Sequence, residues 1–393
     1  MKILVWQWGR FGAGPRFGAC LAQALRGRPG VEVTLSLCRD AEIMTGPKPP
    51  RCELPVRTYR GMASFLLRLA TAPVALPFLL ARLHRFKPDL AICAMPGPLD
   101  VLMAVALRLL GTRLVVVVHD ADTHPGDGFP GQMTLQRLLC RLAGGLAVLC
   151  GHVGTRLALQ GLAGTARRKL IAFEHPPFAF EMPVGERADG PHRLLCFGRL
   201  LPYKGLDLLA GALASLPQDV AVSVRVVGCG PESPALDALR ACPNVTVENR
   251  WVPETEIGAL LAWSDALILP YREASQSGVA AAALAAGRPV IATRVGGLRE
   301  QLSGAPQIVL CEPDTASMAR AIRFWLETPI QIAPPIDAAA AWRQAAFDLL
   351  LAIGTALPPK QRPVTNRPTS HLPDWALRLP GRGTRLSDSA RRQ

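Results

Sequence analysis

Short apolar, β-branched runs alternate with longer Leu- and Ala-rich stretches along most of this chain. The runs in the first half predict strands at Ile3–Val5, Val31–Leu37, Leu90–Ala94, Leu114–His119 and Gly145–Leu149. Helical patterns such as Ala19–Arg26 and Val101–Leu110 separate them. Uniformly apolar strands that alternate with helices are typical of a parallel sheet covered on both faces. Residues 1–175 are therefore predicted to form one doubly wound, Rossmann-like domain.

The alternation stops at residues 176–192, which are rich in Pro, Gly and charge and predict a linker. It then resumes over residues 193–335. The strands expected there are Arg193–Phe197, Ser223–Gly228, Val245–Val247, Ala266–Pro270 and Pro289–Thr293. A chain of 393 residues is too long for one ordinary core. The predicted fold class is therefore α/β, with two Rossmann-like doubly wound parallel-sheet domains that face a cleft.

Two further segments follow the second domain. Residues 336–357 predict a helix, and residues 358–393 are rich in Pro and Arg, with eight basic and two acidic side chains. Because this last segment has little apolar periodicity, we expect it to be a disordered basic tail.

A nearly continuous apolar segment, residues 62–83, lies within the first domain and is followed by His84, Arg85 and Lys87. Its length reaches the range of a membrane span, but Arg68, Pro73 and Pro77 interrupt it. A membrane-surface helix or broken helical pair is the first interpretation, a buried helix the second and a true span the third.

The formal net charge of +14 indicates an anionic partner, such as a phosphorylated substrate or an acidic membrane surface. Only three tyrosines are present and no aromatic–basic interleaving occurs, so nucleic acid is not expected as a partner. The ten cysteines are scattered without a C-x-x-C pair, which indicates reduced thiols rather than disulfides or a metal site. The N-terminus resembles a first strand more than a signal peptide, and we expect a cytoplasmic location.

Ligands of open parallel sheets bind beyond the carboxyl ends of the strands, so glycines and charges at those ends are the candidates for a site. The turn Gly9–Gly14 follows the first strand, where a ligand could approach the backbone and a helix N-terminus favours an anion. A purely structural tight turn explains the same glycines. His119 and Asp120 end another buried strand, with His124 nearby, and no third ligand at a metal spacing accompanies them.

The strongest candidate is Gly198-Arg199 followed by Lys204 at the start of a helix. Arg199 offers a bidentate fork and Lys204 a point charge, so the pair predicts a diphosphate site, against the alternative of solvated surface charge. Two glycine-containing loops follow. Gly228 and Gly230 end a strand where a base or ribose could lie, and Ser275–Gly278 opens a helix whose amides could cap an anion.

At these positions the sequence resembles the family 4 retaining glycosyltransferases of the GT-B fold. The resemblance rests on FGRLLPYKGLDLL, VVGCGP, WSDALILPY and SGVAAAALAAGRPVIATRVGGL, in that order, with His119 and the first Gly-rich turn before them. It implies that Arg199 and Lys204 bind the donor diphosphate and that His119 contacts the transferred sugar. The donor-binding candidates are Gly12, Gly198, Gly228, Gly230, Gln276, Ser277, Gly278 and Val279. It further implies a nucleotide-sugar as substrate, no cofactor and no metal, and a last helix that returns to the N-terminal domain.

One departure from the family pattern concerns two glutamates, eight positions apart, that many members carry before the AAG-x-P stretch. Ala274 and Ala282 stand at those positions, although Glu273 adjoins the first. The second glutamate usually holds the donor ribose, so the nucleotide contacts are expected to differ. The Gln-Ser-Gly form of this loop is similar to that of bacterial polysaccharide-assembly members.

The sequence thus predicts a retaining, metal-independent hexosyltransferase of polysaccharide biosynthesis. Its acceptor is expected to be a saccharide, most simply a lipid-linked one, at the inner face of the cell membrane. Two alternatives remain open. A sugar-nucleotide epimerase shares the fold but needs acid–base carboxylates in the cleft, of which the sequence shows few. A non-catalytic GT-B membrane partner of another transferase is the other.

Overall fold

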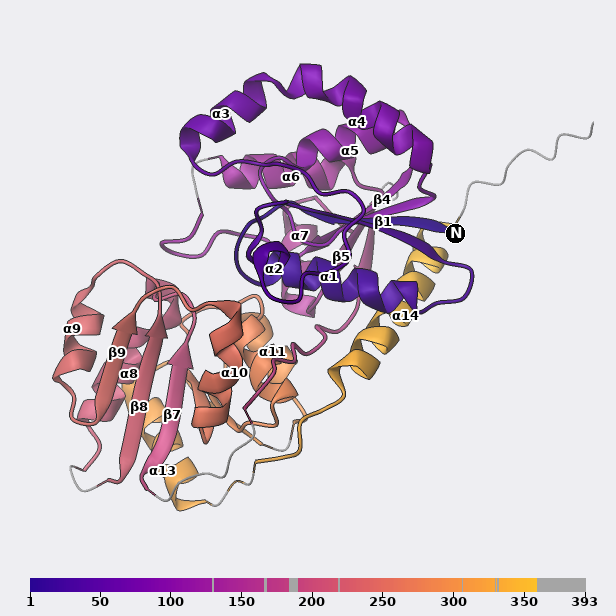
Figure 1. The fold of residues 1–393 in the computed structure, drawn as a ribbon. Helices are drawn as coiled ribbons and strands as arrows, with labels where there is room; N and C mark the ends of the chain where they lie inside the picture. The colour runs from indigo at the N-terminus through magenta and orange to yellow at the C-terminus, as the bar shows by residue number, and fades with distance from the viewer. Residues whose placement is uncertain are drawn as a thin grey trace, which may run out of the picture. The chain divides into compact units, whose positions relative to one another are not determined.

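The computed structural model describes residues 1–128, 131–165, 168–183, 190–217, 220–305, 307–328, 330 and 332–358. Residues 1–358 form one compact unit that contains two parallel sheets (Figure 1). The predicted tail, apart from Pro358, lies outside the described residues, and so do residues 184–189 of the predicted linker.

The N-terminal sheet has six parallel strands in the order β2-β1-β3-β4-β5-β6. Its strands are β1 Lys2–Gln7, β2 Glu32–Leu37, β3 Leu90–Cys93, β4 Arg113–Val118, β5 Gly145–Val148 and β6 Lys169–Ala172. The β-branched run of β4 alternates between the two apolar cores, with Val115 and Val117 on one face and Val116 and Val118 on the other. Burial of both faces explains why the central strands are apolar throughout.

Helices cover both faces of this sheet (Figure 1). They are α1 Ala13–Arg26, α2 Glu42–Thr45, α3 Met62–Ala70, α4 Ala72–Phe86, α5 Asp100–Leu109, α6 Gln132–Leu142 and α7 Gly151–Leu159. Side chains of α1 belong to one core, and those of α4, α5 and α6 belong to the other.

The C-terminal sheet also has six parallel strands, in the order β12-β11-β10-β7-β8-β9. Its strands are β7 His192–Phe197, β8 Val222–Gly228, β9 Val245–Asn249, β10 Ala266–Leu269, β11 Val290–Thr293 and β12 Ile308–Cys311. Its helices are α8 Leu206–Ala214, α9 Pro234–Ala241, α10 Glu254–Trp263, α11 Gly278–Ala285, α12 Gly296–Leu302 and α13 Thr315–Glu327. The two sheets confirm the predicted fold class.

The last described helix, α14 Ala338–Ala356, packs against α1 and β6 of the N-terminal half (Figure 1). Asp337 caps its N-terminus by accepting a hydrogen bond from the Ala340 amide at 2.9 Å. Trp342 enters the same core as Phe17, and its indole N–H donates to the Pro177 carbonyl at 2.8 Å. Trp342 thus connects α14 both to the core of the N-terminal domain and, through Pro177, to the segment that follows this domain.

Several elements differ from the sequence-based prediction. The first helix begins at Ala13, six residues before the expected start, because the glycine-containing turn ends at Gly12. Strands β6 and β12 and helix α12 were not predicted. Both strands lie at sheet edges and only part of each is buried, so their sequences lack the continuous apolar signal of central strands.

The apolar segment 62–83 forms two helices, α3 and α4, that meet at Thr71 with a bend of 71°. Among the described residues no single helix is long and apolar enough to cross a membrane, whereas this bent pair together reaches that length and composition. Leu83 is fully buried, but Leu67, Val74 and Phe78 are 64%, 68% and 74% exposed. The segment is therefore not the buried helix of the second interpretation.

Candidate active site

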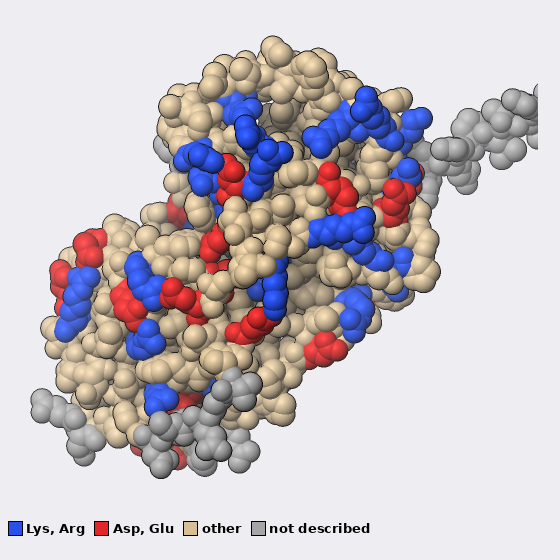
Figure 2. All heavy atoms as spheres, viewed as in Figure 1, with Lys and Arg blue, Asp and Glu red and all other residues tan. Residues whose placement is uncertain are grey.

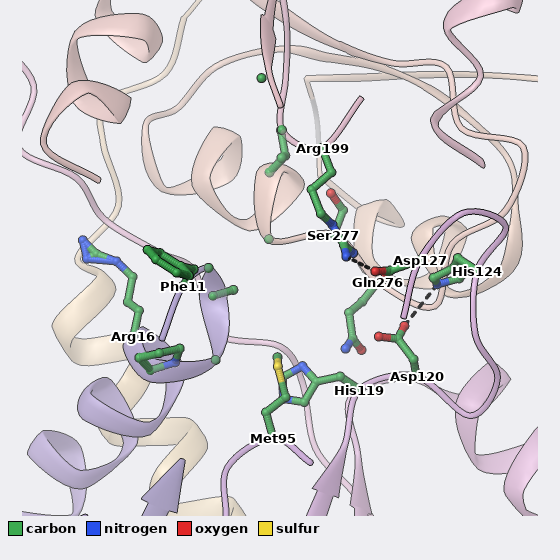
Figure 3. A pocket seen from close by; sticks show the side chains of 18 of the residues that line it. Phe11, Arg16, Met95, His119, Asp120, His124, Asp127, Arg199, Gln276 and Ser277 are labelled. Carbon is green, nitrogen blue, oxygen red and sulfur yellow. Dashed lines mark hydrogen bonds and ion pairs between the residues drawn. The ribbon is translucent and has the colours of Figure 1, made fainter. Parts of the chain in front are cut away.

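A cavity of about 610 Å³ lies at the carboxyl ends of both sheets (Figure 3). Its wall combines the turn after β1, the loop after β4, the loop after β7 and the N-terminus of α11. Of the predicted site residues it brings together His119, Arg199, Lys204, Gly12, Gly198, Gly228, Gln276, Ser277, Gly278 and Val279. Gly230 does not line it.

Arg199 follows β7 and already has two partners. Its Nη1 lies 2.5 Å from Asp127 Oδ1 in an ion pair, and its Nη2 donates a hydrogen bond to the Tyr203 hydroxyl at 2.9 Å. Asp127 belongs to the loop after β4, in the N-terminal half, and Figure 3 shows the pair meeting across the cavity. The guanidinium therefore faces an anion in the structure, and that anion is a carboxylate of the same chain.

Lys204 ends the short helical turn Pro202–Lys204 just before α8. Its Nζ lies 3.6 Å from the ring centroid of Tyr271 and 5.0 Å from that of Tyr203, so two aromatic faces hold it. Burial, followed by the nearby charge of Arg199, lowers the pKa of Lys204 to about 7. A diphosphate beside Lys204 and Arg199 would favour the charged form of this amine.

His119 follows β4 directly, and its side chain is buried at the edge of the cavity. Its Nε2 lies 2.9 Å from the Ala94 carbonyl, and the Phe17 ring meets it edge to face. A carbonyl only accepts, so Nε2 carries the proton and Nδ1 keeps a free lone pair. Burial lowers the pKa of His119, which keeps the ring neutral at physiological pH.

The N-termini of α1 and α11 lie next to each other in the wall of the cavity. A Cβ on Gly278 would lie 3.7 Å from the Ala13 Cβ, so the two first turns are close neighbours. Ser277 caps α11 by accepting from the Ala280 amide, and its own amide donates to Gln301 at 2.8 Å. The first amides of α11 that remain for a ligand are those of Gly278 and Val279.

Gly228 ends β8 and Gly230 follows it, and both glycines pack against the loop after β7. A Cβ on Gly228 would lie 1.6 Å from the Gly198 carbonyl oxygen, and one on Gly230 would lie 2.1 Å from that of Leu200. Gly230 also exchanges two hydrogen bonds with the Asn249 side chain. These glycines allow the loops after β7 and β8 to touch, which shapes the site without requiring contact with a nucleotide. Gly230 therefore has a packing role, and its donor-binding role stays a prediction.

Both positions of the missing glutamates are occupied by buried alanines, Ala274 and Ala282. The neighbouring Glu273 does not take their place, because its carboxylate pairs with His124 at 3.4 Å. His124 also pairs with Asp120 at 3.2 Å and stacks on the Tyr203 ring. Burial lowers the pKa of His124, but the hydrogen bonds and charges of Asp120 and Glu273 together outweigh burial and raise the pKa above its ordinary value.

The cavity contains more carboxylates than the sequence indicated, and each is engaged. Besides Asp127, Asp122 pairs with Arg156 at 2.8 Å and Glu254 pairs with Arg16 at 2.6 Å. The Arg16–Glu254 pair joins α1 to α10 and so links the two halves of the cleft. Asp127 and Glu254 were missed because their role depends on how the two sheets face each other. The sequence signal that could have found Asp127 is the run HDADTHPGD, residues 119–127, which contains three aspartates after β4.

No group of three or more His, Cys, Asp or Glu side chains suited to a metal occurs within the described ranges. All ten cysteines are free thiols. Among the described residues, the basic Arg and Lys side chains that line the cavity are Arg10, Arg16, Arg199 and Lys204.

Comparisons with known proteins agree with this geometry. Residues 12–172 match the family described as "Glycosyl transferase 4-like domain", and residues 191–328 match "Glycosyl transferases group 1". The chain is 27% identical over 301 residues to 2-deoxystreptamine glucosyltransferase of Streptomyces kanamyceticus, covering 70% of this chain and 77% of that protein. It is 29% identical over 213 residues to GDP-mannose:glycolipid 4-beta-D-mannosyltransferase of Xanthomonas campestris, covering 49% of this chain and 53% of that protein. The chain belongs to the family 4 glycosyltransferases of the GT-B fold, which confirms the resemblance found in the sequence.

Solved structures share the fold at lower identity. The Anabaena HepE protein in complex with UDP-glucose superposes with a TM-score of 0.62 at 18% identity, over 91% of this chain and 98% of that chain. UDP-GlcNAc 2-epimerase of Neisseria meningitidis bound to UDP-GlcNAc gives a TM-score of 0.56 at 12% identity, over 89% of this chain and 100% of that chain. Transferases and epimerases thus share this architecture, and the side chains of the site must distinguish them.

Proposed function

We propose that this protein is a retaining, metal-independent hexosyltransferase that uses a nucleotide-diphosphate sugar and a lipid-linked saccharide acceptor. The observation that carries the proposal is the meeting of Arg199, Lys204 and the N-terminus of α11 on one wall of the cavity. Two cations and two free amides suit a diphosphate, because charged donors and a helix N-terminus both favour an anion.

The proposed reaction leaves the anomeric configuration unchanged. The donor sugar lies between the diphosphate site and His119, and the diphosphate departs towards Arg199 and Lys204 on the face from which the acceptor hydroxyl arrives. A departing phosphate oxygen takes the proton of that hydroxyl. Catalysis then comes mainly from positioning and from stabilising the charge on the leaving group.

The choice of donor is a proposal supported by relatives. The Xanthomonas relative is named for GDP-mannose, and the HepE complex contains UDP-glucose. GDP-mannose and UDP-glucose are therefore the first donors to test. Release of nucleoside diphosphate should require both a donor and a lipid-linked saccharide. If no combination of donor and acceptor raises release above the rate of donor alone, the proposal is wrong.

A membrane acceptor is supported by the exposed apolar side chains of α3 and α4, which we call the α3–α4 surface. Its most exposed apolar members are Met62, Leu66, Leu67, Val74 and Phe78. Residues 62–88 contain no acidic side chain, whereas Arg68, Arg82, Arg85 and Lys87 are basic. Figure 2 shows Lys and Arg side chains beside this pair of helices, whereas the outermost surface of the helices, at the top of the view, carries no charged side chain. Such a surface suits insertion into the interface of an anionic membrane.

Liposome flotation tests this attachment to the inner face of the cell membrane. Wild-type protein should float with anionic liposomes at low salt, and less at high salt, because surface attraction is screened. Phe78→Glu should abolish flotation without unfolding the protein, since Phe78 is 74% exposed. Leu159→Glu on α7, where the side chain is 77% exposed, is the matched control and should float like wild type. Equal flotation of both variants would show that the α3–α4 surface does not attach the protein to the membrane.

The epimerase alternative is weakened by the state of the carboxylates. Five carboxylates among the described residues line the cavity. Those of Asp120, Asp122, Asp127 and Glu254 are held in ion pairs, and that of Glu42 accepts a hydrogen bond from the Glu254 amide. These contacts do not suit the free acid–base groups that an epimerase needs. An epimerase would change the configuration of the donor sugar without an acceptor. The sugar of the donor recovered from an acceptor-free incubation therefore distinguishes an epimerase from a transferase: a changed configuration indicates an epimerase, and an unchanged one a transferase. A non-catalytic partner would show neither reaction while still binding the membrane.

A further inference from the structure

Arg10 is a cation of the cavity that has no carboxylate beside it. Arg16 and Arg199 each pair with a carboxylate, and Lys204 is held between two tyrosine rings. Arg10 lines the same cavity and is half-buried, yet no carboxylate in the described ranges forms an ion pair with it. A cation that is partly shielded from water and lacks a counter-charge is unfavourable, so this position favours a ligand that brings an anion.

The turn after β1 holds Arg10 in place through its backbone and through a ring contact. The Arg10 carbonyl accepts a hydrogen bond from the Glu42 amide at 2.9 Å. The Glu42 carboxylate has another partner, because its Oε1 accepts from the Glu254 amide at 2.8 Å. The guanidinium carbon of Arg10 lies 4.9 Å from the centre of the Phe11 ring. These contacts position the guanidinium without neutralising its charge.

Arg10 belongs to a different side of the cavity from the predicted diphosphate site. It follows β1 of the N-terminal sheet, whereas Arg199 and Lys204 follow β7 of the C-terminal sheet. Figure 3 shows Phe11, on which Arg10 packs, on the side of the cavity away from the Arg199–Asp127 pair. A diphosphate held by Arg199 and Lys204 therefore leaves Arg10 for a second anion.

The residues that lead into α3 lie next to Arg10. Burial raises the pKa of the Tyr59 hydroxyl, and the charge of Arg10, which is close enough to act on this hydroxyl, opposes the rise. The Tyr59 ring meets the Phe65 ring of α3 edge to face, with 5.2 Å between the ring centres. Arg68 of α3 donates from Nε to the Thr58 carbonyl at 3.1 Å. Tyr59 and Phe65 thus connect the Arg10 side of the cavity to the α3–α4 surface.

We propose that Arg10 binds the phosphate through which the acceptor saccharide is linked to its lipid. This inference rests on the proposed transferase function and deepens it, because it names the group that the acceptor must carry. With the α3–α4 surface in the membrane interface, the phosphate of the acceptor lies among the headgroups and its sugar extends into the cavity. An arginine fork matches the oxygens of a phosphate and supplies the opposite charge.

Binding of geranyl diphosphate, a short isoprenyl chain with the same anionic group, tests this role directly. The titration is done with the donor site saturated by UDP or GDP, so that the probe reports the second anion site. Arg10→Ala should weaken the Kd of geranyl diphosphate about tenfold or more, because a charge-assisted contact is lost. Arg10→Lys keeps the charge and should lose less. The Kd of UDP or GDP itself should stay within about twofold in both variants.

Arg28→Ala is the matched control. Arg28 also lies over a phenylalanine ring, at 4.0 Å from the centre of Phe347, but it does not line the cavity. This variant should bind geranyl diphosphate like wild type. With a diphosphate-linked lipid saccharide as acceptor, Arg10→Ala should raise KM for the acceptor and leave KM for the donor unchanged.

Three outcomes would overturn the role of Arg10. If the Kd of UDP or GDP weakens as much as that of geranyl diphosphate, Arg10 belongs to the donor site. If Arg10→Ala binds geranyl diphosphate as wild type does but floats less with anionic liposomes, Arg10 contacts membrane lipids in general. If wild type does not bind geranyl diphosphate, the second anion site does not exist. Failure of the proposed function would be distinct, because wild type would then turn over no donor while its binding of geranyl diphosphate still depended on Arg10.

Discussion

Asp127→Asn should increase the affinity of the protein for nucleoside diphosphates. In the structure Asp127 Oδ1 lies 2.5 Å from Arg199 Nη1, so a donor diphosphate that binds Arg199 must displace this carboxylate. Asn has the same shape and keeps a hydrogen-bonding group for the loop, but it removes the competing charge. The variant therefore isolates the competition between two anions for one guanidinium.

The size of the effect follows from the exposure of the pair. The Arg199 side chain is 51% exposed and that of Asp127 is 27% exposed, so solvent screens their attraction. An exposed ion pair contributes about 1 kcal/mol or less and a buried one more, so this pair should contribute about 1–2 kcal/mol. If the donor has to break it, Asp127→Asn should lower the Kd of UDP or GDP roughly 5- to 30-fold.

Calorimetric titration with UDP and with GDP at two salt concentrations measures this gain. Asp122→Asn is the matched control, because Asp122 lies in the same loop but pairs with Arg156. It should leave both Kd values unchanged. An Asp127→Asn variant that binds both nucleotides no better than wild type would contradict the reasoning, since Arg199 would not then be exchanging one anion for another.

Three further outcomes follow from the same geometry. His119→Ala should abolish turnover while the Kd of nucleoside diphosphate changes less than threefold, because the proposed reaction places His119 beside the donor sugar and not beside the diphosphate. An equal loss of diphosphate binding would place His119 at the phosphates. The Kd of nucleoside diphosphate should rise about tenfold for wild type between pH 6 and 8.5, because Lys204, whose pKa is about 7 when the site is empty, loses its charge as pH increases. Lys204→Arg should lack this part of the change. Equal pH profiles of wild type and Lys204→Arg would show that Lys204 does not cause the pH dependence. Gly228→Ala should lower the melting temperature markedly, because its Cβ would lie 1.6 Å from the Gly198 oxygen; a melting temperature equal to that of wild type would show that the loops can separate at no cost.

The cavity residues on single strand ends could be predicted from the sequence. His119 and Gly198 each follow an apolar strand, and the carboxyl ends of parallel strands lie at one edge of a sheet. Chain order and residue type were enough to bring them together with Arg199 and Lys204. The resemblance to a family then assigned them roles.

Contacts across the cleft could not be predicted in this way. The pairing of Asp127 with Arg199 and of Arg16 with Glu254 depends on the placement of one sheet against the other, which no local pattern encodes. The packing role of Gly230 was missed for a related reason. Glycine at a strand end suits both a ligand and a neighbouring loop, and only the position of the Leu200 carbonyl distinguishes them.

The central claim is that Arg199 and Lys204 form the diphosphate site of a glycosyltransferase. Binding of UDP, GDP and the corresponding free nucleosides to wild type, Arg199→Ala and Lys204→Ala tests it most directly, together with kcat/KM for the preferred donor. Each variant should lose roughly 30- to 1,000-fold in kcat/KM, or about 2–4 kcal/mol of transition-state stabilisation, and should bind diphosphates more weakly while its affinity for nucleosides is unchanged. Activity and diphosphate binding within a few-fold of wild type in both variants would contradict the account.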